Sequence, residues 1–139
     1  MKKLAILLSL SFLLAACDLG FPKMTVNYDN LPHGKIKEYI TKTFPNEPEK
    51  EVLSKIIYAQ LSGDESADNI RKTVSQMGMT CEVEKEICEY SGYIKTKVAG
   101  ISSGSGRAKR IYHIVIFPKK GMDSLKIEYQ IVEDTEKVN

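Results

Sequence analysis

The sequence lacks tryptophan and contains only two histidines, which excludes a metal centre built from several histidines. It carries no large excess of either charge, with 20 Lys and Arg against 18 Asp and Glu. Its three cysteines are an odd number, so at least one has no partner for a disulfide within the chain. What remains is 139 residues, 42% of them hydrophobic, which is an ordinary composition for one globular domain.

The first 16 residues predict a secretory signal peptide, because two lysines are followed by a short, mostly apolar run from Leu4 to Ala16. As a helix this run spans about 20 Å, too short for a bilayer core of about 30 Å. The run ends in Leu14-Ala15-Ala16-Cys17, which resembles the lipobox of bacterial lipoproteins. The resemblance implies cleavage before Cys17 and lipidation of that cysteine. The alternative is a plain signal peptide followed by an incidental cysteine.

Lipidation of Cys17 implies a bacterial cell-envelope protein that is attached to a membrane and faces the periplasm. Asp18 resembles the inner-membrane retention signal of enteric lipoproteins, and the outer membrane is the alternative. Removing 16 of the 139 residues leaves 123, and the loss of Lys2 and Lys3 leaves 18 basic against 18 acidic residues. A formally neutral chain gives no general support for binding nucleic acid.

Cys81 and Cys88 remain as a pair in a chain expected to enter an oxidising compartment. A hairpin centred between Glu84 and Lys85 would place the two cysteines directly opposite each other, within reach of a disulfide. We therefore expect a structural disulfide. The alternatives are a metal pair or two free thiols, although zinc usually takes four ligands and redox cysteines usually have two residues between them.

Hydrophobic spacing predicts helices first and strands after them. The helical period appears in three segments: 36–44, 49–61 and 66–77. Strand patterns appear in three later segments: 88–98, 111–117 and 125–131. The Gly- and Ser-rich segment 99–108 is expected to be a mobile loop. The predicted fold is two-layer α+β, with helices packed on a three-stranded antiparallel β-meander. The predicted organisation is a signal peptide (1–16), a lipid-anchored tether (17–32) and a single domain (33–139).

A series of glycines and apolar residues runs through the body of the chain, between about residues 49 and 132. An apolar helix ending at Leu61 is followed by Gly63 with Ser66 and Ile70, then Met77-Gly78, then Cys88-Glu89-Tyr90 entering a strand. This order resembles the SmpA/OmlA (BamE-like) lipoproteins, whose founding member is an accessory part of the machine that inserts outer-membrane β-barrels. The resemblance implies an α-α-β-β-β fold and an envelope location.

Catalytic and cofactor motifs are not recognisable in the sequence. Residues 100–107 do not match the Gly-x-x-x-x-Gly-Lys-Ser/Thr loop that cradles phosphate, and no helix pattern follows them. His113 lies in the middle of a predicted strand, where a structural histidine is commoner than a general base. We therefore expect no enzyme activity, no cofactor, no metal and no small-molecule substrate.

The charges are unevenly distributed along the neutral chain. Between Glu89 and Asp123 there are seven Lys and Arg and no acidic residue. A basic edge of this kind can face anionic lipid headgroups or an acidic partner, and solvated strand ends are the alternative. Side chains on the open face of the sheet and in this basic segment are the predicted partner-binding residues: Tyr93, Lys95, His113, Val115, Arg107, Lys109 and Arg110.

The sequence thus predicts a membrane-anchored periplasmic lipoprotein that acts as a protein-binding or scaffolding module of the cell envelope. Its expected partners are the membrane, through the lipid on Cys17, and an envelope protein. The alternative is an inhibitor or immunity-type lipoprotein that blocks a specific hydrolase or toxin with a loop such as residues 100–106.

Overall fold

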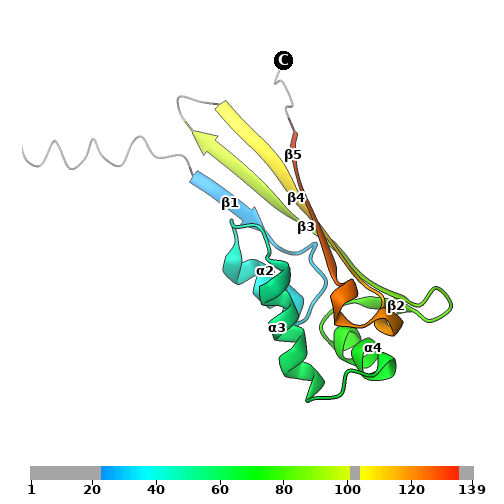
Figure 1. The fold of residues 1–139 in the computed structure, drawn as a ribbon. Coiled ribbons are helices and arrows are strands. Elements are labelled where there is room, and N and C mark those ends of the chain that lie inside the picture. Colours follow the sequence, from blue (N-terminus) through cyan, green and yellow to red (C-terminus); the bar gives the residue numbers. More distant parts are fainter. Residues whose placement is uncertain (1–22, 101–103, 135–139) are drawn as a thin grey trace, which may run out of the picture.

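The computed structural model describes residues 23–100 and 104–134, which form an α+β fold of three α-helices and five strands (Figure 1). The helices are α2 (Lys35–Thr43), α3 (Lys50–Leu61) and α4 (Ala67–Gln76). The strands are β1 (Lys23–Asn27), β2 (Thr80–Glu82), β3 (Ile87–Gly100), β4 (Gly104–Ile116) and β5 (Lys126–Asp134). Two 3-10 helices, η2 (Pro118–Lys120) and η3 (Met122–Ser124), lie between β4 and β5.

The long strand β3 is the centre of an antiparallel sheet. β4 pairs with one edge of β3 and β5 pairs with β4, which is the predicted meander. β1 and β2 both pair with the other edge of β3, β1 with residues 95–99 and β2 with residues 87–89. The α+β class is confirmed, whereas the expected number of three strands is wrong because two short segments add to the free edge of β3.

The chain enters the domain earlier than the sequence predicted. Residues 17–32 were expected to form a tether, but Lys23–Asn27 forms β1 and Leu31 is buried in the core. Asn30 then runs beside β3, where its carbonyl accepts a hydrogen bond from the Tyr93 amide at 3.3 Å. A Cβ on Gly92 would lie 2.8 Å from that carbonyl oxygen, so the close approach requires glycine. The expected start of the domain at residue 33 is therefore wrong.

Most of the segment predicted as a mobile loop, residues 99–108, belongs to strands. β3 continues to Gly100 and β4 begins at Gly104, with the two strands in register up to the pair Gly100–Gly104. Thr96 Oγ1 donates a hydrogen bond to the Ala108 carbonyl at 3.4 Å across this part of the ladder. Backbone pairing that continues from the better-packed part of the hairpin overrides the weak strand propensity of Gly and Ser.

The predicted disulfide between Cys81 and Cys88 is confirmed. β2 and β3 form a hairpin in which these two residues are directly paired, with Cα atoms 4.0 Å apart. The turn lies over residues 83–86, where the Glu86 amide donates to the Val83 carbonyl at 3.2 Å. Because the pairing is local, a symmetric hairpin was enough to predict its register.

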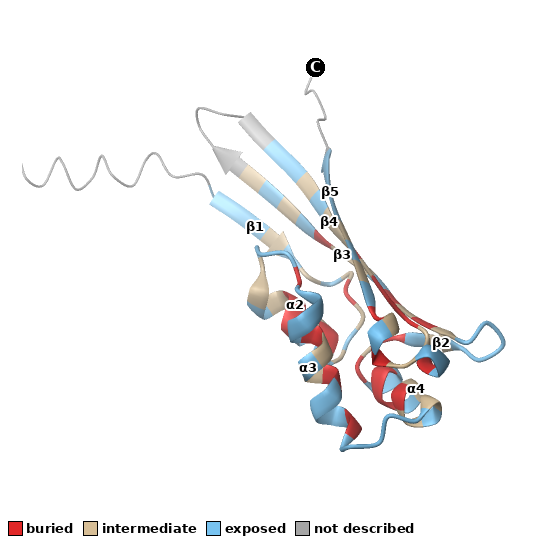
Figure 2. Ribbon diagram, viewed as in Figure 1, coloured by how far each residue is buried: buried red, intermediate tan, exposed pale blue. Residues whose placement is uncertain are grey.

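The hydrophobic core lies between the helices and one face of the sheet. Figure 2 shows the buried residues gathered where the helices and the strands meet. The helices contribute side chains such as Ile36, Ile57, Ile70 and Val74, all fully buried. The sheet contributes alternate residues of its central strands: Tyr90, Ile94, Tyr112 and Ile114. The other face of β3 and β4 lies outside this cluster.

Tyr112 places an unsatisfied polar group in this core. Its hydroxyl is buried and has no hydrogen-bond partner among the described residues, and burial raises its pKa to about 12. We expect Tyr112→Phe to raise the free energy of unfolding by about 1 kcal/mol, because an unsatisfied polar group is removed. Urea denaturation at neutral pH measures this change.

The same substitution should alter the response to alkali. The folded state holds the Tyr112 proton more tightly than the unfolded chain does, so stability falls as the pH rises from 10, the ordinary pKa of tyrosine, towards 12. Tyr112→Phe should therefore flatten the fall in stability over this range. Tyr129→Phe is the matched control, since it removes a hydroxyl that accepts a hydrogen bond from Arg110 at 2.9 Å and should destabilise the protein instead. A loss of stability in Tyr112→Phe would contradict this interpretation.

Candidate interaction surface

The face of the sheet opposite the helices carries most of the predicted partner-binding residues, and we call it the open face. Side chains alternate along a strand, so Ser91 and Tyr93 point away from the core face that carries Tyr90 and Ile94. The registers of β3 with β4 and of β4 with β5 place the outward side chains of these three strands next to one another. The open face of these two central strands includes Tyr93, Lys95, Lys97, Arg107, Lys109, Ile111, His113 and Val115.

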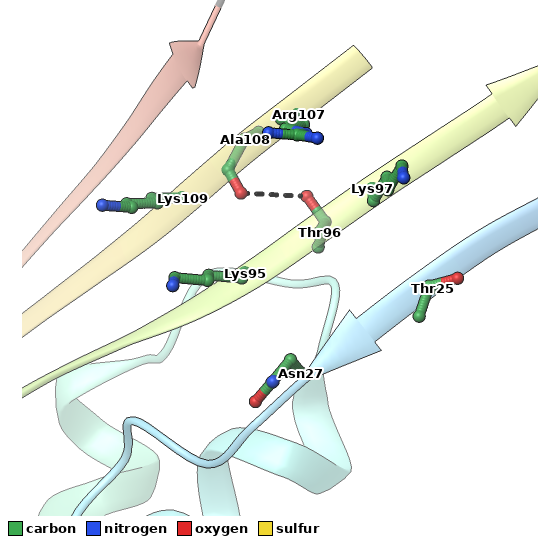
Figure 3. Close-up of a pocket in the computed structure, with 8 residues that line it drawn as sticks. All are labelled: Thr25, Asn27, Lys95, Thr96, Lys97, Arg107, Ala108 and Lys109. Carbon is green, nitrogen blue, oxygen red and sulfur yellow. Dashed lines mark hydrogen bonds between the residues drawn. The ribbon is translucent and has the colours of Figure 1, made fainter. Parts of the chain in front are cut away.

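Four basic residues form a compact group on this face, which we call the cationic block: Lys95, Lys97, Arg107 and Lys109. Lys95 pairs with Lys109 and Lys97 pairs with Arg107 across the β3–β4 ladder, so the four occupy two adjacent rows. Figure 3 shows their side chains next to Thr25 and Asn27 of β1, around the hydrogen bond from Thr96 to Ala108. Together these residues line a shallow hollow of about 390 Å³.

Tyr93 lies next to the cationic block on the open face, and its ring contacts two of the lysines. The Lys109 Nζ lies 5.2 Å from the centre of its ring and the Lys95 Nζ lies 5.7 Å from it. Both distances allow cation–π attraction, which is worth about 0.5–1 kcal/mol at exposed sites. The ring therefore holds the two ammonium groups over the same part of the open face.

His113 occupies the next part of the open face and lies between two carboxylates. Its Nδ1 is 3.3 Å from Glu128 on β5, and its Nε2 is 3.5 Å from Glu89 on β3. These contacts become ion pairs when the imidazole is protonated. Val115, the next residue on this face, is only 9% exposed and lies outside the core cluster. This part of the face holds two carboxylates around one imidazole, in contrast to the cationic block.

The structure brings together six of the seven predicted partner-binding residues and separates the seventh. Arg110 points to the helix side, where its guanidinium donates hydrogen bonds to the Pro45 carbonyl and to the Tyr129 hydroxyl and stacks 4.8 Å from the Phe44 ring. Arg110 lies on a different face from Lys109 because neighbouring residues of a strand point to opposite faces. This alternation would have excluded Arg110 if residues 99–108 had been predicted as a strand.

Lys97, Thr25 and Asn27 belong to the same surface but were not among the predicted partner-binding residues. The strand pattern of residues 88–98 already places Lys97 on one face with Tyr93 and Lys95, as the structure does. Thr25 and Asn27 pair with Lys97 and Lys95 through β1, a strand that the sequence pattern did not indicate. Their place on the surface depends on that pairing alone.

Lys97 and Arg107 should repel each other, because they are like charges directly across a ladder, although Asp134 of β5 pairs with Arg107 from its other side. We expect Lys97→Glu, which places an opposite charge beside Arg107, to raise the free energy of unfolding by about 0.2–1 kcal/mol. Lys97→Gln removes the repulsion without adding attraction and should give an intermediate value. Urea denaturation at low salt measures both changes. A loss of stability in Lys97→Glu would mean that Lys97 supports the fold.

The remaining predictions concern lipidation and metal binding. Cys17, Asp18 and the lipobox lie outside the described residues. Within residues 23–100 and 104–134, no helix is long and apolar enough to cross a membrane, and no group of three or more His, Cys, Asp or Glu is arranged to hold a metal ion. Comparisons with protein-family models, with curated proteins and with solved structures found no match.

Proposed function

We propose that the protein is a lipid-anchored lipoprotein of the bacterial cell envelope, and that its domain binds an envelope protein through the open face. The observation that carries this proposal is the composition of that face. A half-buried aromatic ring, two lysines held around it and a histidine between two glutamates form one surface outside the hydrophobic core. Aromatic residues are enriched in protein interfaces and polar residues form the rim around them, so Tyr93 would be the centre of the contact and the charged residues its rim.

The lipid anchor is supported by the sequence Leu14-Ala15-Ala16-Cys17. A disulfide in the folded domain agrees with export, since disulfides persist in oxidising compartments. We also propose kinship with the SmpA/OmlA (BamE-like) lipoproteins, supported by helices that precede a meander of three antiparallel strands. β1, β2 and one of the three helices are additions to the α-α-β-β-β order of that family. Asp18 favours the inner membrane.

A catalytic role is the strongest competing interpretation of the open face, because Ser91, His113 and Glu128 lie in one row of the sheet. This is the order of a serine–histidine–acid triad. However, the imidazole Nε2 that would take the serine proton is within 3.5 Å of Glu89. An oxyanion hole also needs free backbone amides, whereas amides in the middle of paired strands are engaged in the ladder. We therefore propose binding without catalysis.

The alternative function is an inhibitor or immunity-type lipoprotein that blocks a hydrolase or toxin. The observation that favours it is the length of the β3–β4 hairpin, with strands of 14 and 13 residues. The end of this hairpin extends beyond the helices in Figure 1. A projecting hairpin can enter the cleft of another protein, so the identity of the partner decides between the two functions.

Photo-crosslinking in living cells tests the proposal. A photoreactive amino acid at Tyr93 should capture an envelope protein, and the same substitution at Tyr58, an exposed tyrosine of α3, is the matched control. Capture of a hydrolase or toxin at Tyr93 would favour the alternative function. Capture at Tyr58 without capture at Tyr93 would contradict the assignment to the open face.

Fractionation of cells that express Cys17→Ala tests the anchor. The wild-type chain should stay with the membrane after washing in high salt. The variant should lose stable attachment, because the acyl chains supply about 0.8 kcal/mol for each buried methylene group. Equal retention of both chains would contradict lipidation at Cys17.

A further inference from the structure

The cationic block combines charges in a way that the fold does not require. Two like-charged pairs lie side by side on the central strands, Lys95 with Lys109 and Lys97 with Arg107. Such pairs repel each other within the domain. Asp134 of β5 pairs with Arg107 from its other side, whereas Lys109 pairs with Val132 and Lys95 with Asn27. A surface that carries many negative groups would attract these basic residues and offset their mutual repulsion.

The position of the cationic block near the start of the domain indicates that the membrane is this negatively charged surface. β1 enters the sheet at the same end, with Thr25 opposite Lys97 and Asn27 opposite Lys95. Lys23, the first described residue, is six residues after Cys17. Six extended residues span at most about 20 Å. If Cys17 holds the lipid, the end of the sheet that carries the block stays within that distance of the bilayer.

We propose that the cationic block docks on the anionic phospholipid headgroups of the membrane to which the chain is anchored. This inference rests on the proposed lipid anchor. Docking turns the β3–β4 end of the sheet towards the bilayer, and it leaves the part of the open face from Tyr93 to His113 for the protein partner. The attraction acts only within a Debye length, about 8 Å at physiological salt, so the short link to Cys17 is what makes it effective.

The chemistry of the block suits a headgroup layer. Each lysine ammonium is a compact charge with three hydrogen-bond donors on a flexible stem. Thr25 and Asn27 add uncharged polar groups beside them (Figure 3). The hollow is shallow, and its lysines present several positive charges to a layer of phosphate groups. Each basic residue near such a layer favours docking by roughly fivefold.

Lysine labelling on vesicles tests this docking. The full lipidated chain, purified from membranes, is reconstituted in vesicles of phosphatidylcholine alone or mixed with phosphatidylglycerol, and a water-soluble acylating reagent is added. Mass spectrometry then follows Lys95 in the block and Lys72 on α4 as an internal reference. On vesicles with phosphatidylglycerol, Lys95 should react several-fold more slowly than on phosphatidylcholine, whereas the rate at Lys72 should not change.

Two double variants with the same charge change separate docking from a general charge effect. Lys97→Glu with Lys109→Glu should restore fast labelling of Lys95, since the loss of two basic residues weakens docking by roughly 25-fold or more. Lys42→Glu with Lys55→Glu places the same change on α2 and α3 and should leave Lys95 protected. Raising the salt concentration should also remove the protection in the wild-type chain.

The remaining outcomes are distinguishable. A chain that fails to float with either kind of vesicle overturns the lipid anchor, and with it the docking that depends on the anchor. A chain that floats while Lys95 reacts equally fast on both kinds of vesicle overturns the docking alone and keeps the anchor. Slow labelling of Lys95 on pure phosphatidylcholine would show that the docking is not electrostatic and would overturn the proposal. Protection of Lys95 that appears only when an acidic protein is added would assign the cationic block to that protein instead of the lipid.

Discussion

Gly34→Ala is expected to lower the free energy of unfolding by about 3 to 5 kcal/mol. Gly34 has a φ of +137°, in a region that side chains other than glycine rarely adopt. A Cβ there would also lie 2.4 Å from the Met77 carbonyl oxygen, at the end of α4. Backbone strain and collision with a backbone atom therefore add together. The site matters because the Ile36 amide bonds to the same carbonyl and joins the start of α2 to α4.

Gly63→Ala is the matched control for this prediction. Gly63 has a φ of +81°, but nothing lies within 4 Å of the Cβ that the substitution would add. It should therefore lose only the strain contribution, about 1 kcal/mol. Urea denaturation of both variants measures the difference. Equal losses would show that the contact with Met77 is unimportant, and that backbone strain accounts for the whole effect at Gly34.

Arg110→Ala is expected to destabilise the domain by about 2 kcal/mol. The guanidinium connects the sheet to the segment after α2 through the Pro45 carbonyl and the Phe44 ring, and it also donates to the Tyr129 hydroxyl at 2.9 Å. Alanine leaves both oxygens without this donor. Thermal or urea denaturation checks the loss.

The neighbouring substitution Lys109→Ala should behave in the opposite way. Lys109 lies on the open face opposite Lys95, so its removal relieves repulsion and should change stability by less than about 0.5 kcal/mol. Vesicle docking should weaken in Lys109→Ala and should persist in any Arg110→Ala molecules that remain folded. If Arg110→Ala were neutral for stability and Lys109→Ala destabilising, the assignment of these residues to opposite faces would be wrong.

Local features of the structure were predictable because their causes lie within a few residues. The helical segments were found from their apolar spacing, and the start of α4 agrees with the cap at Ser66, whose Oγ accepts a hydrogen bond from the Asn69 amide at 3.3 Å. The pairing of Cys81 with Cys88 follows from a short hairpin. Alternation along β3 correctly placed Tyr93 and Lys95 on one face, opposite Tyr90 and Ile94.

Features that depend on distant pairing were not predictable in this way. β1 has little apolar pattern of its own, with Met24 56% exposed, and it becomes a strand because β3 offers a free edge. The ends of β3 and β4 are rich in Gly, Ser and Lys, and they become strands because the ladder below them sets their register. The strand propensity of single residues contains no information about the strand with which a segment will pair.

The sequence by itself therefore determined the helices, the disulfide, the α+β class and the alternation of side chains along each strand, since all of these depend on neighbours along the chain. The tertiary structure alone decided which charges meet. It brought Lys95 and Lys97 of one strand beside Arg107 and Lys109 of another, set Thr25 and Asn27 next to them, and turned Arg110 into the helix layer. The physical reason is that a cationic surface depends on strand register, and register is a property of the whole sheet.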